Sequence, residues 1–141
     1  MIPLLLLVAG AVSCPVLNTA TARGAIGEVQ LAVTQLEKSA GYTCRFTGAE
    51  AELTIEVSTL ADTGQFSRLA ESECQGGHEV APLKAIGNEA VACSSGVDGQ
   101  IVEKVAGRVR KQAFVIRLTT KGKSARTKIT MLAEQVAGNL F

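Results

Sequence analysis

The first residue with distinctive chemistry is Cys14, one of four cysteines in this chain of 141 residues. The sequence Ala11-Val12-Ser13-Cys14 is similar to a bacterial lipobox, in which the cysteine is lipidated and becomes the new N-terminus. The apolar run from Ile2 to Val12 precedes it. This run is too short for a transmembrane helix and is typical of the apolar region of a signal peptide. Cys14 is therefore the candidate for lipidation.

Two other interpretations of the N-terminus remain open. Ala20-Thr21-Ala22 fits the A-x-A pattern of ordinary signal-peptidase cleavage, and an uncleaved anchor is the third possibility. All three predict an extracytoplasmic protein, either a membrane-anchored lipoprotein or a secreted or periplasmic protein. We expect residues 1–22 to be the signal and a short tether, and residues 23–141 to form a single α+β domain.

The cysteines beyond the predicted signal are Cys44, Cys74 and Cys93. In an oxidising compartment two of these three should pair. A bridge between Cys74 and Cys93 encloses 18 residues, and closing a loop of that size stabilises a fold by roughly 3 kcal/mol in the chain-entropy model. We predict Cys74–Cys93 first and Cys44–Cys93 second, with the third cysteine either a small buried residue or a reactive thiol.

The only histidine, His78, lies between two of these cysteines. Cys74, His78 and Cys93 lack a C-x-x-C pair and a fourth ligand, so no metal site is predicted. The chain also lacks a phosphate-binding glycine loop, a nucleophile elbow and a metalloprotease helix motif. The sequence therefore predicts neither a catalytic residue nor a cofactor.

The charges are divided unevenly along the chain. Residues 23–98 carry 5 Lys/Arg and 11 Asp/Glu, a net charge of −6, whereas residues 99–141 carry 9 Lys/Arg and 2 Asp/Glu, a net charge of +7. The candidate basic surface consists of Arg108, Arg110, Lys111 and Arg117 on one predicted strand. These cations could balance the acidic half inside the fold, which is the interpretation we favour, or contact anionic lipid or polymer. The whole chain has a formal charge of +1, no Trp and one Tyr, so no nucleic-acid partner is predicted.

Hydrophobic periodicity predicts the elements that must position these residues. Apolar residues at helical spacing predict a helix from Gly27 to Ala40 and another that begins after Ser124, with the stripe Ile129, Leu132, Ala133, Val136 and Leu140. Asp62, with Gln65 in capping-box register, begins a helix that ends near Cys74. Strands are expected at 42–47, 52–58, 90–93, 101–105 and from Arg108 to Thr120, where alternation is typical of a half-buried strand. Residues 18–24 are expected to be a tether and residues 75–82 a loop.

The predicted fold class is α+β, with a five-stranded, mostly antiparallel sheet packed with three helices. The predicted order is helix, strand, strand, helix, strand, strand, strand, helix. Three motifs accompany this order: Ser13-Cys14, Tyr42-Thr43-Cys44-Arg45-Phe46 and Ala85-Ile86-Gly87-Asn88-Glu89-Ala90. Together they resemble families of unknown function among bacterial secreted lipoproteins, which have a turn similar to G-x-G-[ND]-x-A; Ala85 replaces its first glycine. The resemblance implies a PsbP-like fold, an antiparallel sheet flanked by helices, and an extracytoplasmic binding or accessory module.

We therefore expect a non-enzymatic cell-envelope domain that binds an envelope protein or a ligand and is held at the membrane by an N-terminal lipid anchor. The alternatives are a thiol-dependent envelope enzyme that uses an unpaired cysteine and a structural envelope protein.

Overall fold

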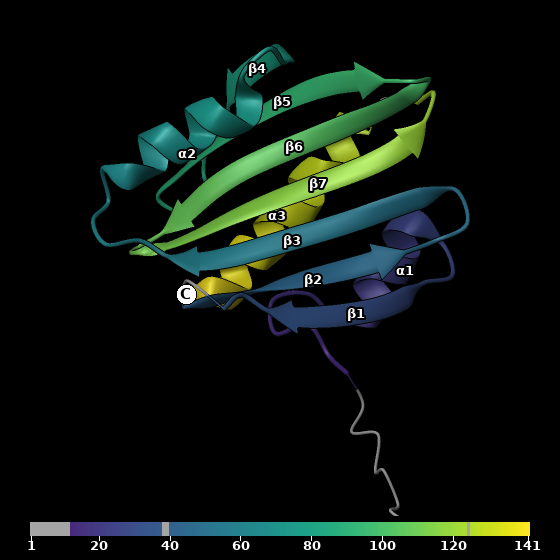
Figure 1. Ribbon diagram of the computed structural model, residues 1–141, viewed down its shortest axis with the longest axis horizontal. Coiled ribbons are helices and arrows are strands. Elements are labelled where there is room, and N and C mark those ends of the chain that lie inside the picture. Colours follow the sequence, from purple (N-terminus) through teal and green to yellow (C-terminus); the bar gives the residue numbers. More distant parts are fainter. Residues whose placement is uncertain (1–11, 38–39, 124) are drawn as a thin grey trace, which may run out of the picture.

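The computed structural model describes residues 12–37, 40–123 and 125–141, except for the side chain of Val97. Within these residues, the centre of the fold is one antiparallel sheet of seven strands (Figure 1). Across the sheet the strand order is β1-β2-β3-β7-β6-β5-β4. Each half is a meander, and the two halves meet where β3 pairs with β7. The elements in chain order are α1 (Thr19–Ile26), β1 (Gln30–Gln35), β2 (Gly41–Thr47), β3 (Ala51–Thr59), α2 (Gln65–Cys74), β4 (His78–Pro82), β5 (Glu89–Val97), β6 (Gln100–Val109), β7 (Gln112–Lys121) and α3 (Arg126–Leu140).

The class is α+β, but the predicted five-stranded sheet is wrong, because β1 and β4 add a strand at each edge. The segment expected to be a helix from Gly27 to Ala40 contains β1 instead, in which Leu31 pairs with Phe46 and Val33 with Cys44. The segment expected to be a loop at 75–82 contains β4, a five-residue strand with an irregular register between His78 and Ala81. Both missed strands are edges, where one face and one side of the backbone are exposed and the apolar pattern is therefore weak.

The N-terminal segment also differs from the expected tether. Residues 19–26 form α1, and the side chain of Asn18 caps this helix by accepting a hydrogen bond from the backbone N–H of Thr21 at 2.7 Å. Val16 and Leu17, which precede the helix, are buried. The packed part of the chain thus begins before Arg23, and the predicted boundary between residues 22 and 23 falls inside a helix.

The main core lies between one face of the sheet and the helices α1 and α3, which lie behind the sheet in Figure 1. Four of the five residues of the stripe predicted for α3 are buried, namely Ile129, Leu132, Ala133 and Val136, and Leu140 is partly buried against the same core. They pack with alternate residues of the central strands, such as Leu53, Ile55 and Val57 of β3 and Phe114, Ile116 and Leu118 of β7.

The opposite face of the sheet carries a smaller core under α2, which lies in front of the sheet in Figure 1. Phe66 and Ala70 of α2 pack there with Ala106 of β6 and with Ala113 and Val115 of β7. The strand expected to be half-buried, β7, is therefore buried on both faces over residues 113–116. Its side chains alternate between the two cores, which fixes the register of its neighbours.

Candidate functional site

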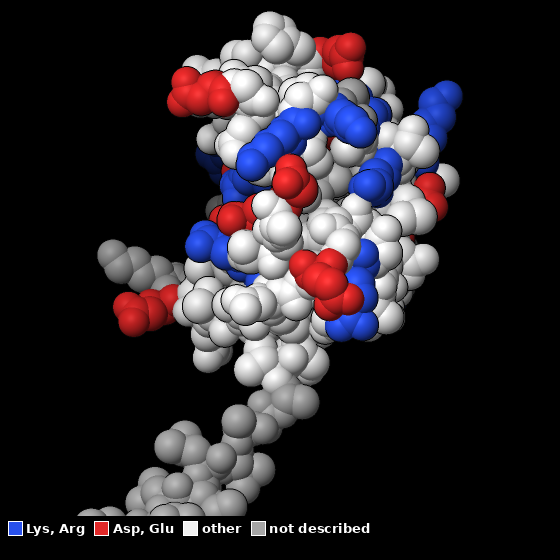
Figure 2. All heavy atoms as spheres, turned by 90° about the vertical axis from the view of Figure 1, so that its right-hand side faces the viewer, with Lys and Arg blue, Asp and Glu red and all other residues white. Residues whose placement is uncertain are grey.

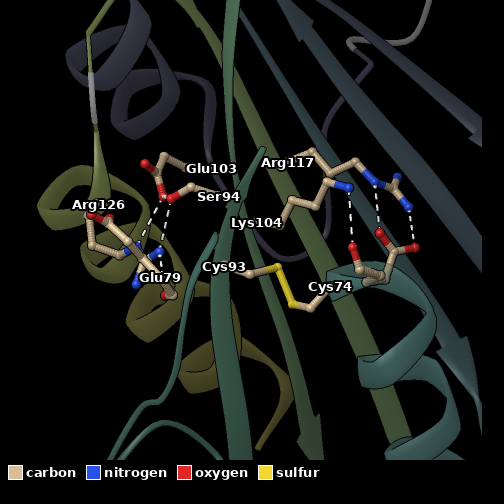
Figure 3. Close-up of a disulfide and its surroundings, with 9 residues drawn as sticks. Cys74, Glu79, Cys93, Ser94, Glu103, Lys104, Arg117 and Arg126 are labelled. Atoms are coloured by element: carbon tan, nitrogen blue, oxygen red, sulfur yellow. Dashed lines mark hydrogen bonds and ion pairs between the residues drawn. A yellow bond between two sulfur atoms is a disulfide. The ribbon is translucent and has the colours of Figure 1, made fainter. Parts of the chain in front are cut away.

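The first site residues to place are the cysteines. The structure joins Cys74 at the end of α2 to Cys93 on β5, the pair ranked first from the sequence, with the two Cα atoms 5.7 Å apart. This bridge fastens the last turn of α2 to the sheet (Figure 3).

A second disulfide joins Cys14 to Cys44 on β2, with the Cα atoms 5.9 Å apart. From the sequence, Cys14 was expected to belong to the signal, with lipidation as one alternative, so that one of the other three cysteines stayed unpaired. This expectation is wrong, because all four cysteines are paired in the structure. A sulfur in a disulfide cannot also carry a lipid thioether, so these two uses of Cys14 exclude each other. Two disulfides indicate an oxidising, extracytoplasmic environment.

Next to the Cys74–Cys93 bridge, two cations support the C-terminal end of α2 (Figure 3). Lys104 and Arg117 are cross-strand partners on β6 and β7. The Lys104 Nζ donates to the carbonyl oxygen of Glu73 at 3.1 Å, and Arg117 binds the Glu73 carboxylate and, at 3.0 Å, that of Glu56. Positive charge at this position is favourable because the carbonyl end of a helix carries partial negative charge. Burial works to lower the pKa of Arg117, but the hydrogen bonds and charges of Glu73 and Glu56 outweigh it and the pKa is raised.

A second polar cluster lies on the opposite face of the sheet. Glu103 of β6 is 1% exposed, and its carboxylate accepts hydrogen bonds from the Ser94 Oγ at 2.8 Å and the Arg126 Nε at 3.0 Å. Arg126 also donates to the Glu79 carbonyl oxygen at 3.0 Å (Figure 3). This cluster fixes the start of α3 against three strands, β4, β5 and β6. This cluster was not predicted from the sequence, although an acidic residue within the apolar strand around Ile101 to Val105 was a signal for a buried partner.

The four residues of the predicted basic surface are not gathered into one site. Arg108 pairs with Glu89 at 2.8 Å and Arg117 with Glu56 and Glu73, so both balance acidic residues from the other half of the chain. Arg110 and Lys111 lie in the turn between β6 and β7 and are exposed. Neither of their side chains forms an ion pair with a residue that the structure describes.

The most suitable place for a ligand is a pocket of about 680 Å³ at one end of the sheet. It lies among the C-terminal end of α1, the N-terminal end of α3, the start of β3 and the end of β7. Its volume is within the range of small-molecule sites, roughly 300–1,000 Å³. The lining residues are Ala25, Ile26, Glu50, Ala51, Thr120, Lys121, Lys123, Ala125, Arg126, Thr127 and Lys128.

This pocket is predominantly basic. Its lining includes three exposed lysines, Lys121, Lys123 and Lys128. Arg126 also lines it but forms an ion pair with Glu103. Among the described lining residues, Glu50 is the one acidic residue. Figure 2 views this end of the sheet, with Lys and Arg side chains clustered over the upper half and acidic side chains between and around them. Ala25, Ile26, Ala51 and Ala125 add an apolar part to the lining.

The start of α3 adds to the positive potential. The first turn contains no acidic residue, and its N-cap residue, Ala125, makes no capping hydrogen bond through its side chain. Cations in the first turn of a helix are unfavourable because the N-terminal end already carries partial positive charge. Such a local conflict is often found at functional sites. An anion in the pocket would relieve it.

Among the described residues, the other features do not indicate a further catalytic or binding site. His78 is exposed on the edge strand β4. Among the described residues, no group of His, Cys, Asp or Glu side chains has the arrangement of a metal site. Over the same residues, no helix has the length and apolar composition needed to cross a membrane. No protein-family model matches the chain, and a comparison with curated proteins finds no similar sequence.

Proposed function

We propose that this protein is a non-enzymatic, extracytoplasmic binding domain that holds a small organic anion in the pocket between α1 and α3. The observation that carries the proposal is a group of three exposed lysines, Lys121, Lys123 and Lys128, around the pocket. The pocket lies at the start of α3, and among the described residues no side chain caps this helix. A carboxylate or phosphate group of the ligand would interact with the lysines and the first-turn backbone. The apolar part of the lining would contact its carbon atoms.

The two alternative functions have less support. A thiol-dependent enzyme needs a free cysteine, and all four cysteines are in disulfides. A structural envelope protein does not require a basic pocket of the size of a small-molecule ligand. An envelope protein with an acidic surface group would be a larger partner for the same pocket.

Whether the protein is anchored to a membrane or released depends on the chemical state of Cys14. A lipid anchor at Cys14 would tether the domain to a membrane, but it would remove the sulfur that bonds Cys44. The released form, with Cys14 in its disulfide, agrees better with the buried position of this cysteine, which is 7% exposed.

The binding proposal can be tested by NMR titration of the disulfide-bonded protein with succinate and, separately, inorganic phosphate at low ionic strength. We expect saturable shifts of backbone signals centred on residues 120–128 and 50–51. The double variant Lys123→Gln/Lys128→Gln should weaken binding at least tenfold, and Glu50→Gln should strengthen it because a repelling carboxylate is removed.

A matched control removes the same charge elsewhere. Lys84→Gln/Lys111→Gln changes two exposed lysines that do not line the pocket. If this control weakens binding as much as the pocket variant, or if no signal near the pocket shifts with either anion, the proposal is wrong. Tighter binding of succinate or of phosphate would show whether the pocket prefers a carboxylate or a phosphate group in its ligand.

A further inference from the structure

The segment before and within α1 is part of the main core. Cys14, Val16, Leu17, Ala22 and Ala25 are all buried there, each with at most 7% exposure. Cys14 is covalently joined to β2.

The other end of the chain holds the same segment. The side-chain amide of Asn139, near the end of α3, donates to the carbonyl oxygen of Val16 at 2.8 Å. Residues 14–26 therefore behave as an element of the domain and not as a removable leader.

This packing conflicts with cleavage after Ala22. Such cleavage would separate Val16 and Leu17 from the core and divide α1 after its fourth residue. It would also remove the partner of Cys44, which is completely buried, and leave its thiol in an apolar cavity. The A-x-A match at Ala20-Thr21-Ala22 has a simpler explanation, because small residues such as Ala22 fit closely where the helix packs on the sheet.

We propose that export processing cuts the chain before Cys14, so that the mature protein keeps residues 14–26 and uses the Cys14 thiol for the disulfide with Cys44. Two patterns upstream of Cys14 have small residues at the positions that signal peptidase reads: Ala9-Gly10-Ala11 and Ala11-Val12-Ser13. Ala11 is the last residue of the first pattern and the first residue of the second. Cleavage adds water across the peptide bond after Ala11 or after Ser13.

The disulfide then forms by exchange with an oxidised dithiol protein of the export compartment. The thiolate of Cys14 or Cys44 attacks that protein's disulfide, and the second thiolate displaces it from the mixed disulfide. Two electrons and the two thiol protons of Cys14 and Cys44 pass to the partner, whose disulfide is thereby reduced to two thiols. Lipidation would instead form a thioether at the Cys14 sulfur, so the two products are distinguishable by mass. This inference does not depend on the proposed function of the pocket.

To test this proposal, the full chain is expressed in a bacterial host that exports it. The intact mass of the mature protein is measured without reduction, and peptide mapping follows. We expect an unacylated N-terminus at Val12 or Cys14 and a linked peptide that contains Cys14 and Cys44. A mature protein that begins at Arg23, one that carries acyl chains on Cys14, or one that is never cleaved would each overturn the proposal.

Two variants separate the competing cleavage sites. Ala11→Lys places a long cation in both upstream patterns, so it should leave the precursor uncleaved. Ala20→Lys disrupts only the downstream pattern at an exposed position of α1, so it should be processed as the natural chain is. Normal processing of Ala11→Lys, or loss of processing in Ala20→Lys, would contradict the assignment even if a variant folds poorly, because cleavage precedes folding.

Discussion

Gly107 of β6 lies directly opposite Phe114 of β7, and the Phe114 ring occupies the space where a side chain at residue 107 would begin. The neighbours of Gly107 pair with β7 in continuous register, so this glycine marks neither a turn nor a bulge. The glycine is required by a close approach in the centre of the sheet. We expect Gly107→Ala to lower the free energy of unfolding by about 1–3 kcal/mol, measured by urea denaturation, because the ring or the strand must move.

The cause of this effect can be isolated with a second substitution. In a Phe114→Leu background, Gly107→Ala should cost clearly less, because the ring that it would meet is gone. Gly138→Ala, in α3 with no atom near its new methyl group, should instead stabilise the protein by up to about 1 kcal/mol. An equal loss at Gly107 in both backgrounds would exclude the ring contact as the cause.

Glu73 is expected to be the most sensitive acidic residue of α2. Its carboxylate binds Arg117, whose side chain is only 27% exposed, and Glu73→Gln would leave that guanidinium with a weaker partner. We expect a loss of about 1–3 kcal/mol in the free energy of unfolding. Glu71→Gln on the same helix is the control, since Glu71 is exposed, and it should change stability little. Identical denaturation midpoints for both variants would show that the ion pair does not stabilise the fold.

Two neighbouring residues of α3 test the assignment of its buried face. Leu132 is completely buried and Met131 is 46% exposed. Leu132→Asp should cost at least about 3 kcal/mol or prevent folding, because a carboxylate would be buried without a partner. Met131→Asp should have a small effect. Leu36→Asp should have an effect between these two, because Leu36 is only partly buried and lies just beyond the end of β1. Thermal denaturation followed by circular dichroism gives the order.

The two disulfides are expected to contribute unequally. Replacing Cys74 and Cys93 by serine should cost roughly 3 kcal/mol, and replacing Cys14 and Cys44 should cost more, because the sequence separation is 30 instead of 19 and both of these cysteines are buried. Chemical denaturation of each double variant, with the remaining bridge intact, measures the difference. The reverse order would contradict the larger contribution assigned to the N-terminal bridge.

Local sequence patterns were sufficient for the elements that have one clear buried stripe or alternation. The helical stripe of α3 and the alternation in β7 both reappear as buried faces. The capping box predicted for Asp62 and Gln65 is present only in part. The Asp62 side chain accepts from the Gln65 N–H at 3.2 Å as expected, but the Gln65 side chain accepts from the Ala61 N–H at 3.0 Å, and the helix begins at Gln65 with Gly64 as its N-cap. These features depend on residues within a few positions of one another, which is the range that periodicity and capping signals cover.

Contacts between distant segments decided the rest. Val29, Ala32, Val33 and Leu36 have helical spacing, but Leu31 and Val33 also alternate, and pairing with β2 selects the strand. The basic pocket exists only because β3 and β7, which are more than 50 residues apart, pair and bring Glu50, Lys121 and Lys128 to one end of the sheet. By itself the sequence determined the α+β class, the presence of a disulfide and the uneven charge. The tertiary structure alone decided the two edge strands, the place of the N-terminal segment and the site, because each depends on which surface another part of the chain covers.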